Sequence, residues 1–338
     1  MTGVVALRSA RDTFGRRISR TGAVSTAAAI CGAAPGAPVY GRFVAPEPAP
    51  GKVVVDVRAA GLNPVDIAIA AGSFPGMTPQ YPSVPGHEGV GMVDGQRVYF
   101  SGPVAPFGSM AQHALVARER TVPLPDAVDD GLAIALGTSG LAAWLSLRWR
   151  ARLQPGETVL VLGATGVLGS LAVQAARLLG AGWIVAAGRH GAGWRRAAEL
   201  GADAVVDLDI GVGGDLVTAF RQAAGGNIDV VIDPIWGEPA LAALQASGPF
   251  ARHVQIGNAA SPGMTLPGGA LRRASASILG YSNLMVPIAD RVAAYTAMLG
   301  HAAAGVMTAP VELHPLREVQ QAWARQAAFA HRKLVLVP

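Results

Sequence analysis

The sequence of 338 residues contains a single cysteine, Cys31. One thiol excludes an internal disulfide framework and any zinc lobe built from several cysteine ligands. It also favours a reducing, intracellular setting, so we expect a cytoplasmic protein. Long apolar runs that would require a membrane span are missing as well, and we expect no membrane partner.

Charge is scarce too, at 14% of the residues against 51% hydrophobic residues, which suits a well-buried α/β enzyme of about two domains. The formal net charge is +5, but residues 1–27 carry +4 of it, from five arginines against Asp12. The rest of the chain shows no basic face with interleaved aromatic residues, which argues against nucleic acid as a partner. Residues 1–27 have the composition of an organelle transit peptide or of a disordered extension, and we favour the extension.

A strand, a glycine turn and a helix follow one another over residues 158–180. The apolar run 159–162 predicts a strand buried on both faces, and the helical pattern after the turn ends at Gly180. The turn has the spacing G-x-x-G-x-x-G. Such glycines let the backbone approach a pyrophosphate lying on the N–H groups of the helix N-terminus. We therefore predict nucleotide binding here rather than a purely structural turn.

From residue 155 onward, strand and helix patterns alternate, which predicts a doubly wound α/β domain. The expected strands are 159–162, 183–187, 204–207, 230–233, 253–255 and 277–279, and the helices between them 169–179, 194–200, 215–223 and 238–246. Residues 35–150 are instead mainly β in pattern and rich in glycine and proline turns. There we expect strands at 52–58, 96–100 and 111–116 and a buried helix at 131–147, with a first strand at 27–30. A helix at 289–304 precedes a terminal strand at 333–337, which we expect to return to the first domain.

Four motifs occur in order along the chain: A-A-G-L-N-P-V-D at 59–66, P-G-H-E-G-V-G at 85–91, G-A-T-G-V-L-G at 163–169 and K-L-V-L-V-P at 333–338. Through them the sequence resembles the zinc-independent medium-chain dehydrogenases/reductases of the quinone oxidoreductase (zeta-crystallin-like) family, from about residue 28 to the end. The resemblance implies a GroES-like catalytic domain, 28–150 with 288–338, around a Rossmann domain, 151–287. It also implies NADPH in the cleft between them, and it allows a homodimer.

Zinc-dependent relatives hold the metal with a cysteine, the histidine of a Gly-His-Glu motif and a third Cys or Asp. Here Asn63 stands where the first cysteine would be, and no cysteine lies near 136–138. A catalytic zinc site needs three protein ligands, and His87 and Glu88 supply only two. We therefore predict no metal site. His87 is expected to be a hydrogen-bonded core histidine, with a polar role near the cleft left open, and Glu88 an ion-pair or capping residue.

Without a metal, the hydride acceptor has to be activated by conjugation, as in a quinone or an α,β-unsaturated carbonyl. We expect a small, apolar substrate of this kind. The amide of Asn63 is a candidate donor to its carbonyl oxygen, although Asn63-Pro64 is equally a turn former. Relatives often carry a tyrosine where this chain has Phe74, so Tyr81 is the candidate proton donor and a solvent proton the fallback. Asp66 is expected to cap the following helix.

The resemblance implies cofactor contacts at positions in both domains, with Thr138 at the nicotinamide amide. They are Asn63, Thr138, Gly163, Thr165, Gly166, Val167, Leu168, Gly188, Arg189, Asp233, Gly257, Asn258, Tyr281 and Arg332. NAD-specific proteins place an acid at the end of the second strand, but no acid occurs here from residue 181 to 198. Instead Arg189 is expected to bind the 2′-phosphate of NADPH, while Arg195 and Arg196 solvate the outer face of the next helix.

The function favoured by these residues is an NADPH-dependent reductase of quinones or enones that works without metal. A biosynthetic enoyl reductase acting on a carrier-bound or polyketide-like substrate is a same-fold alternative. A non-catalytic NADPH-binding protein is a third, slightly favoured by the missing tyrosine and disfavoured by the intact glycine turn.

Overall fold

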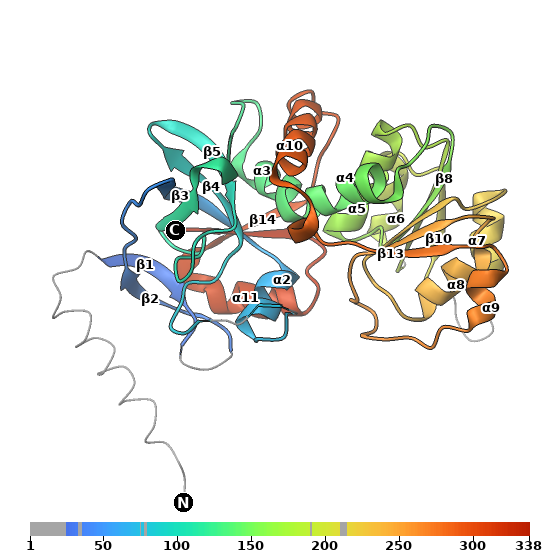
Figure 1. The fold of residues 1–338 in the computed structure, drawn as a ribbon, viewed down its shortest axis with the longest axis horizontal. Helices are drawn as coiled ribbons and strands as arrows, with labels where there is room; N and C mark the ends of the chain where they lie inside the picture. Colours follow the sequence, from blue (N-terminus) through green and yellow to red (C-terminus); the bar gives the residue numbers. More distant parts are fainter. Residues whose placement is uncertain (1–24, 33–35, 75, 78–79, 190, 210–214) are drawn as a thin grey trace, which may run out of the picture. The chain divides into compact units, whose positions relative to one another are not determined.

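The computed structural model describes residues 25–32, 36–74, 76–77, 80–189, 191–209 and 215–338. Their contacts group into two units (Figure 1). Unit 1 consists of the described residues up to Leu124 together with 312–330 and 334–338. Unit 2 consists of 125–311 and 331–333.

Unit 1 is organised around a seven-stranded sheet in the order β14-β15-β3-β4-β5-β7, with β6 also paired to β3. Its strands are β3 (Lys52–Leu62), β4 (Glu88–Val93), β5 (Gln96–Ser101), β6 (His113–Ala117), β7 (Thr121–Pro123), β14 (Val311–Pro315) and β15 (Lys333–Val337). A two-stranded antiparallel sheet joins β1 (Ser25–Ile30) to β2 (Val39–Val44). The helices are α2 (Pro64–Ala70) and α11 (Val319–Ala327), with short 3₁₀ turns η1 (Arg118–Arg120) and η5 (Leu316–Glu318).

The first half of β3 shows why the sheet forms, because its side chains alternate between core and solvent. Val53, Val55 and Val57 are buried, whereas Lys52 and Asp56 are exposed. This period of two places one face of the strand in the core. At the far end of β3, the terminal strand β15 pairs antiparallel with it. The predicted return of the terminal strand to the first domain is confirmed.

Strand β1 begins at Ser25, inside the segment expected to be a disordered extension. Residues 25–27 pair with β2, and Thr26 is buried, its hydroxyl 2.9 Å from Nδ1 of His113. The ordered fold therefore includes these residues. The remainder of the expected extension, residues 1–24, lies outside the described residues.

Unit 2 contains a six-stranded parallel sheet in the order β10-β9-β8-β11-β12-β13. Its strands are β8 (Thr158–Leu162), β9 (Trp183–Gly188), β10 (Ala204–Asp207), β11 (Val230–Asp233), β12 (Arg252–Gln255) and β13 (Ser277–Gly280). The connecting helices are α5 (Val167–Leu178), α6 (Ala192–Glu199), α7 (Leu216–Ala224), α8 (Glu238–Ala246) and α9 (Gly268–Arg272). The predicted α/β class, a GroES-like part and a doubly wound Rossmann part, is confirmed.

The helix expected at 131–147 is a broken one. It runs as α3 (Asp130–Ala135), a π-helical η2 (Leu136–Gly140), α4 (Leu141–Leu145) and a π-helical η3 (Ser146–Ala151). The break occurs at Gly137, whose ψ of −114° leaves the helical region. The segment Asp130–Ala151 is apolar and long enough to cross a bilayer, but 78% of its most apolar window is buried inside the protein. It is a core helix by that measure.

A last long helix, α10 (Ile288–Ala303), and the short η4 (Asn283–Met285) complete unit 2. The hydroxyl of Tyr295 in α10 donates to the carbonyl oxygen of Ala133 at 2.7 Å. This bond and the packing of α10 against α4 explain why the contacts group 125–150 and 288–311 with the parallel sheet. The boundaries of the two units therefore differ from the domain boundaries expected from the sequence.

Candidate functional site

The glycine turn between β8 and α5 needs glycine at two points. Gly163 has φ +63°, and a Cβ atom there would lie 2.9 Å from Cγ2 of Ile235. A Cβ at Gly169 would overlap the carbonyl oxygen of Gly163. At Gly166, the N-cap of α5, a Cβ would be in ordinary van der Waals contact with the carbonyl oxygen of Gly163, 3.4 Å away. The turn leads into a 12-residue helix, whose first N–H groups have no partner within the helix itself.

Thr165 joins this turn to the end of the neighbouring strand β9. A Cβ atom at Gly188 would lie 2.7 Å from Cγ2 of Thr165, and one at Gly193 would lie 2.6 Å from it. The threonine side chain thus fills a hollow that two glycines leave free.

Arg189 follows β9 and is exposed. Its Nη2 lies 3.4 Å from Nε2 of His331, whose Nδ1 lies 3.4 Å from the carbonyl oxygen of Thr165. The sequence prediction named Arg332 and missed its neighbour His331. No sequence signal pointed to it, because it stands 166 positions from Thr165.

Asp233 has a fully buried carboxylate at the end of β11. Its Oδ1 accepts hydrogen bonds from the N–H groups of Ile235 and Trp236, at 2.9 and 2.8 Å. Its Oδ2 lies 2.8 Å from Nε2 of His253, which is also buried. The side chain therefore shapes the turn that packs Ile235 against Gly163.

Thr138 and Tyr281, both predicted cofactor contacts, are linked through a third residue. Asn283 donates from Nδ2 to the carbonyl oxygen of Thr138 at 2.9 Å, and its Oδ1 accepts from the Tyr281 hydroxyl at 2.7 Å. Burial raises the pKa of the Tyr281 phenol well above its ordinary value. Because Thr138 directly follows the helix break at Gly137, Asn283 holds a stretch of backbone that has left regular helix geometry.

The other predicted contacts of unit 2 lie at element ends. Val167 and Leu168 open α5, and the exposed Arg332 precedes β15. Gly257 and the exposed Asn258 follow β12, and a Cβ at Gly257 would lie 2.7 Å from the Pro234 carbonyl oxygen. The turns after β8, β9, β11 and β12 therefore meet at the carboxyl edge of the sheet, where ligands of open α/β sheets bind.

Asn63 belongs to unit 1, where it is buried and forms the N-cap of α2. Its Nδ2 donates to Oδ2 of Asp66 at 3.2 Å and to Oε1 of Glu88 at 2.9 Å, while its backbone N–H donates to Asp66 Oδ2 at 2.8 Å. Glu88 also accepts from the Tyr99 hydroxyl at 2.9 Å. Two carboxylates thus engage the amide that was predicted to donate to a substrate carbonyl. Asp66 takes part in capping α2, as expected, and Glu88 accepts hydrogen bonds at the heart of the network.

Tyr81, the predicted proton donor, is half-buried against the core of unit 1. Its hydroxyl donates to the carbonyl oxygen of Ala70, the last residue of α2, at 2.6 Å. The phenol proton is therefore already used to hold a loop to this helix. Asn63 and Tyr81 lie at opposite ends of α2, and His87 precedes β4 in a half-buried position.

We expect the purified protein to contain no stoichiometric zinc. Within the described residues, no three His, Cys, Asp or Glu side chains gather as a metal-binding group. The amide at the first ligand position is held by carboxylates. Metal analysis by mass spectrometry checks this expectation. One tightly bound zinc per chain, with activity lost to a chelator, would contradict it.

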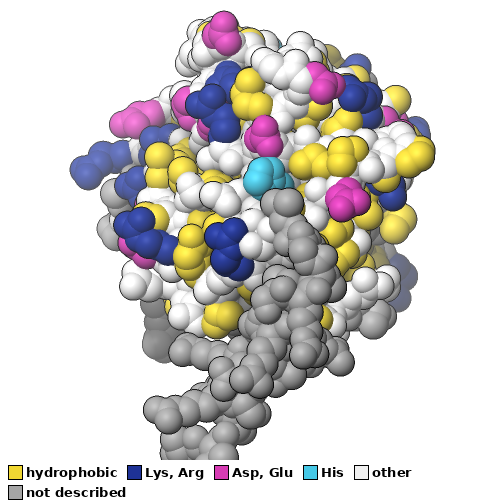
Figure 2. Space-filling view, turned by 90° about the vertical axis from the view of Figure 1, so that its left-hand side faces the viewer, with side chains coloured by type: hydrophobic (Ala, Val, Ile, Leu, Met, Phe, Trp, Pro, Cys, Tyr) yellow, Lys and Arg dark blue, Asp and Glu magenta, His cyan; other side chains and the backbone are white. Residues whose placement is uncertain are grey.

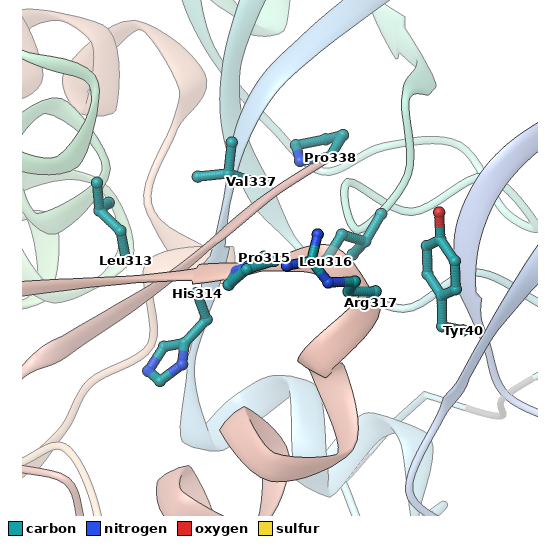
Figure 3. A pocket seen from close by; sticks show the side chains of 8 residues that line it. All are labelled: Tyr40, Leu313, His314, Pro315, Leu316, Arg317, Val337 and Pro338. Carbon is teal, nitrogen blue, oxygen red and sulfur yellow. The ribbon is translucent and has the colours of Figure 1, made fainter.

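A pocket of about 400 Å³ lies entirely within unit 1 (Figure 3). It is lined by Tyr40, Leu313, His314, Pro315, Leu316, Arg317, Val337 and Pro338. None of the predicted site residues lines it, so it does not belong to the site built above. Figure 2 shows the side of the molecule that carries β1 and β2, where basic, acidic and hydrophobic side chains are intermixed over the coloured atoms.

Two protein families match the chain. Residues 49–126 match the family described as "Alcohol dehydrogenase GroES-like domain", and residues 167–295 match that described as "Zinc-binding dehydrogenase". The first match spans β3 to β7, and the second spans the glycine-turn helix and most of the parallel sheet.

Among solved structures, a probable oxidoreductase from Mycobacterium abscessus is 30% identical, with a TM-score of 0.79 over 94% of this chain and 100% of that one. A quinone oxidoreductase from Thermus thermophilus, whose complex with NADPH has been solved, is 27% identical, with a TM-score of 0.75 over 92% of this chain and 100% of that one. Both likenesses extend through unit 1 and unit 2.

Among curated proteins, a phenolphthiocerol/phthiocerol polyketide synthase of Mycobacterium tuberculosis is 32% identical over 217 residues. The match covers 61% of this chain but only 10% of that much longer protein. The similarity therefore concerns one portion of the synthase.

Proposed function

This chain belongs to the medium-chain dehydrogenases/reductases of the quinone oxidoreductase type, and we propose that it is an NADPH-dependent reductase of small, apolar quinones or α,β-unsaturated carbonyls. The observation that carries the proposal is the glycine turn before α5. Gly163 and Gly169 are required by backbone geometry, at the point where β8 turns into α5. Such a turn brings the backbone N–H groups at the start of α5 close to the place that a pyrophosphate would take.

The residues present fit a nicotinamide dinucleotide. The first turn of α5 holds the pyrophosphate, and Thr138, fixed through Asn283, supplies polar backbone for the nicotinamide amide. Arg189 supplies a guanidinium for the 2′-phosphate. The bound cofactor supplies a hydride, and this chain supplies orientation. The NADPH complex of the Thermus thermophilus quinone oxidoreductase supports this choice of cofactor.

The acceptor follows from the polar groups of unit 1. The Asn63 amide and the Tyr81 hydroxyl are engaged inside the protein, at 2.9 and 2.6 Å from Glu88 and Ala70. An unactivated ketone would need a strong electrophile at its oxygen. A quinone or enone accepts hydride at a conjugated carbon and takes its proton from solvent, so it needs neither the Asn63 amide nor the Tyr81 hydroxyl as a donor.

Steady-state oxidation of NADPH, followed at its own absorbance, tests the proposal. We expect turnover with 1,4-naphthoquinone and with 2-alkenals, and none with saturated aldehydes, which serve as the matched control. Binding of NADPH is measured separately by fluorescence titration. Failure to bind NADPH would overturn the proposal, and binding without turnover of any conjugated carbonyl would support the non-catalytic alternative.

The similarity to a portion of a polyketide synthase favours a second candidate, reduction of a carrier-bound enoyl thioester. The thioester of a 2-enoic acid with pantetheine discriminates between the two. A kcat/KM for the thioester well above that for 1,4-naphthoquinone would establish the enoyl reductase, and the reverse order would establish the quinone or enone reductase.

A further inference from the structure

A histidine and an aspartate pair inside unit 2, on neighbouring strands of the parallel sheet. Nε2 of His253 on β12 lies 2.8 Å from Oδ2 of Asp233 at the end of β11, and the two side chains are 1% and 0% exposed. A carboxylate oxygen accepts, so Nε2 donates this bond whether the ring is neutral or charged. The other ring nitrogen, Nδ1, is buried and has no hydrogen-bond partner among the described residues. The polar contact of this ring is therefore the one with Asp233.

The carboxylate of Asp233 in turn holds a strained piece of backbone. Its Oδ1 accepts the N–H groups of Ile235 and Trp236, at 2.9 and 2.8 Å. Trp236 has φ +61°, in the left-handed region that bulky residues rarely adopt. The His253 ring also meets the indole of Trp236 edge-on, with ring centroids 6.1 Å apart and an interplanar angle of 82°. Strained backbone persists where its surroundings over-determine it, and it concentrates at functional sites.

This turn, residues 233–237, borders two backbone segments at the carboxyl edge of the sheet. On one side, Cγ2 of Ile235 lies 2.9 Å from the position of a Cβ at Gly163 in the glycine turn. On the other side, the N–H of Ala260 donates to the carbonyl oxygen of Ile235 at 2.8 Å. A Cβ at Gly257 would lie 2.7 Å from the carbonyl oxygen of Pro234. A shift of this turn would therefore reach both the glycine turn and the segment after β12.

We propose that His253 is a positioning residue for cofactor binding. Its bond to Asp233 fixes the turn 233–237, and this turn fixes the backbone at Gly163, which a pyrophosphate approaches. The inference rests on the proposed function, since it concerns the cofactor of the same site. The pyrophosphate is common to NADPH and NADH, so losing the bond weakens the binding of both cofactors alike. His253 acts through backbone and not on the reacting atoms, so the rate of the bound complex is kept.

His253→Phe keeps a flat ring beside Trp236 and removes both nitrogens. We expect the Kd of NADPH and that of NADH to rise about ten-fold, the lower end of the range for a hydrogen bond to a charged group. At saturating NADPH, kcat with 1,4-naphthoquinone should stay within about two-fold of wild type, because only binding is lost. His253→Gln restores a donor at the ε position, and we expect both Kd values to return to within about three-fold of wild type. Fluorescence titration measures the Kd values.

Val254→Ala is the matched control, because Val254 is the next residue of β12, fully buried on the opposite face of the sheet. It should lower the melting temperature through the cavity it leaves, and it should leave both Kd values unchanged. Circular dichroism shows that each variant is folded before titration. If His253→Phe does not fold, His253→Asn takes its place with the same expectation, because the shorter amide does not reach Oδ2 of Asp233.

Three results would each overturn this inference and leave the proposed function standing. They are wild-type Kd values in the folded variant without the donor, no recovery in His253→Gln, and an equal loss of affinity in Val254→Ala. A wild-type protein that binds neither cofactor would overturn the proposed function, and this inference with it.

Discussion

Replacing Glu88 by alanine is expected to lower the free energy of unfolding by about 3–5 kcal/mol, because two buried donors each lose a charged acceptor, at roughly 1–3 kcal/mol apiece, and a cavity is left. Glu88 is fully buried. Its two oxygens accept the Asn63 amide and the Tyr99 hydroxyl, both at 2.9 Å. Alanine would remove the Glu88 acceptor from the Asn63 amide, which keeps Asp66, and from the Tyr99 hydroxyl, and it would open a cavity where the side chain had been. Urea unfolding at neutral pH measures the effect.

Glu88→Gln is the matched control, since it keeps the volume and one acceptor oxygen. Its amide nitrogen must face one of the two donors, so we expect a smaller loss of about 1–2 kcal/mol. A loss below about 1 kcal/mol for the alanine variant would show that this carboxylate does not hold the N-terminus of α2.

The parallel sheet of unit 2 could be predicted because its strands are short apolar runs separated by helical patterns. Such strands are buried on both faces, so the apolar run alone indicates the strand, without knowledge of its neighbours in the sheet. Strand β4 escaped prediction because it contains Gly89 and Gly91, which lower strand propensity. The structure gives the reason for these glycines: a Cβ at Gly89 would lie 2.7 Å from the Ala59 carbonyl oxygen, and one at Gly91 would overlap the backbone of Asp56.

The same distinction between local patterns and contacts across the fold applies to the candidate site. The glycine turn and Arg189 could be picked out as candidates because each is a local pattern at the end of a strand. The hydrogen-bond partners of Asn63 and Asp233 could not be predicted, because Glu88 and His253 come from other strands. From the sequence, any polar residue near a predicted site is a candidate for binding a ligand. Only the tertiary contacts show whether its hydrogen-bond donors already have partners within the protein. Both side chains are held by hydrogen bonds within the protein.

Replacing Arg189 by alanine is expected to weaken NADPH binding by about ten- to a hundred-fold, the range for a hydrogen bond to a charged group. The guanidinium stands exposed at the carboxyl end of β9, where NAD-specific proteins carry an acid. Among the ion pairs given for the described residues, none joins Arg189 to a carboxylate, and its guanidinium lies 3.4 Å from His331. NADH affinity should change less than about two-fold, since it has no 2′-phosphate to lose contact with.

Arg195→Ala is the matched control for this prediction. It removes the same charge from an exposed position on α6, the helix after the loop. Fluorescence titration with both cofactors compares the three proteins, and the wild-type preference for NADPH should weaken with rising salt because exposed charges are screened. Equal losses for NADPH and NADH in Arg189→Ala would place the arginine at a part common to both cofactors. If Arg195→Ala weakens NADPH binding as much as Arg189→Ala does, Arg189 contributes only general positive charge. Only a loss of NADPH affinity confined to Arg189→Ala identifies Arg189 as the 2′-phosphate ligand.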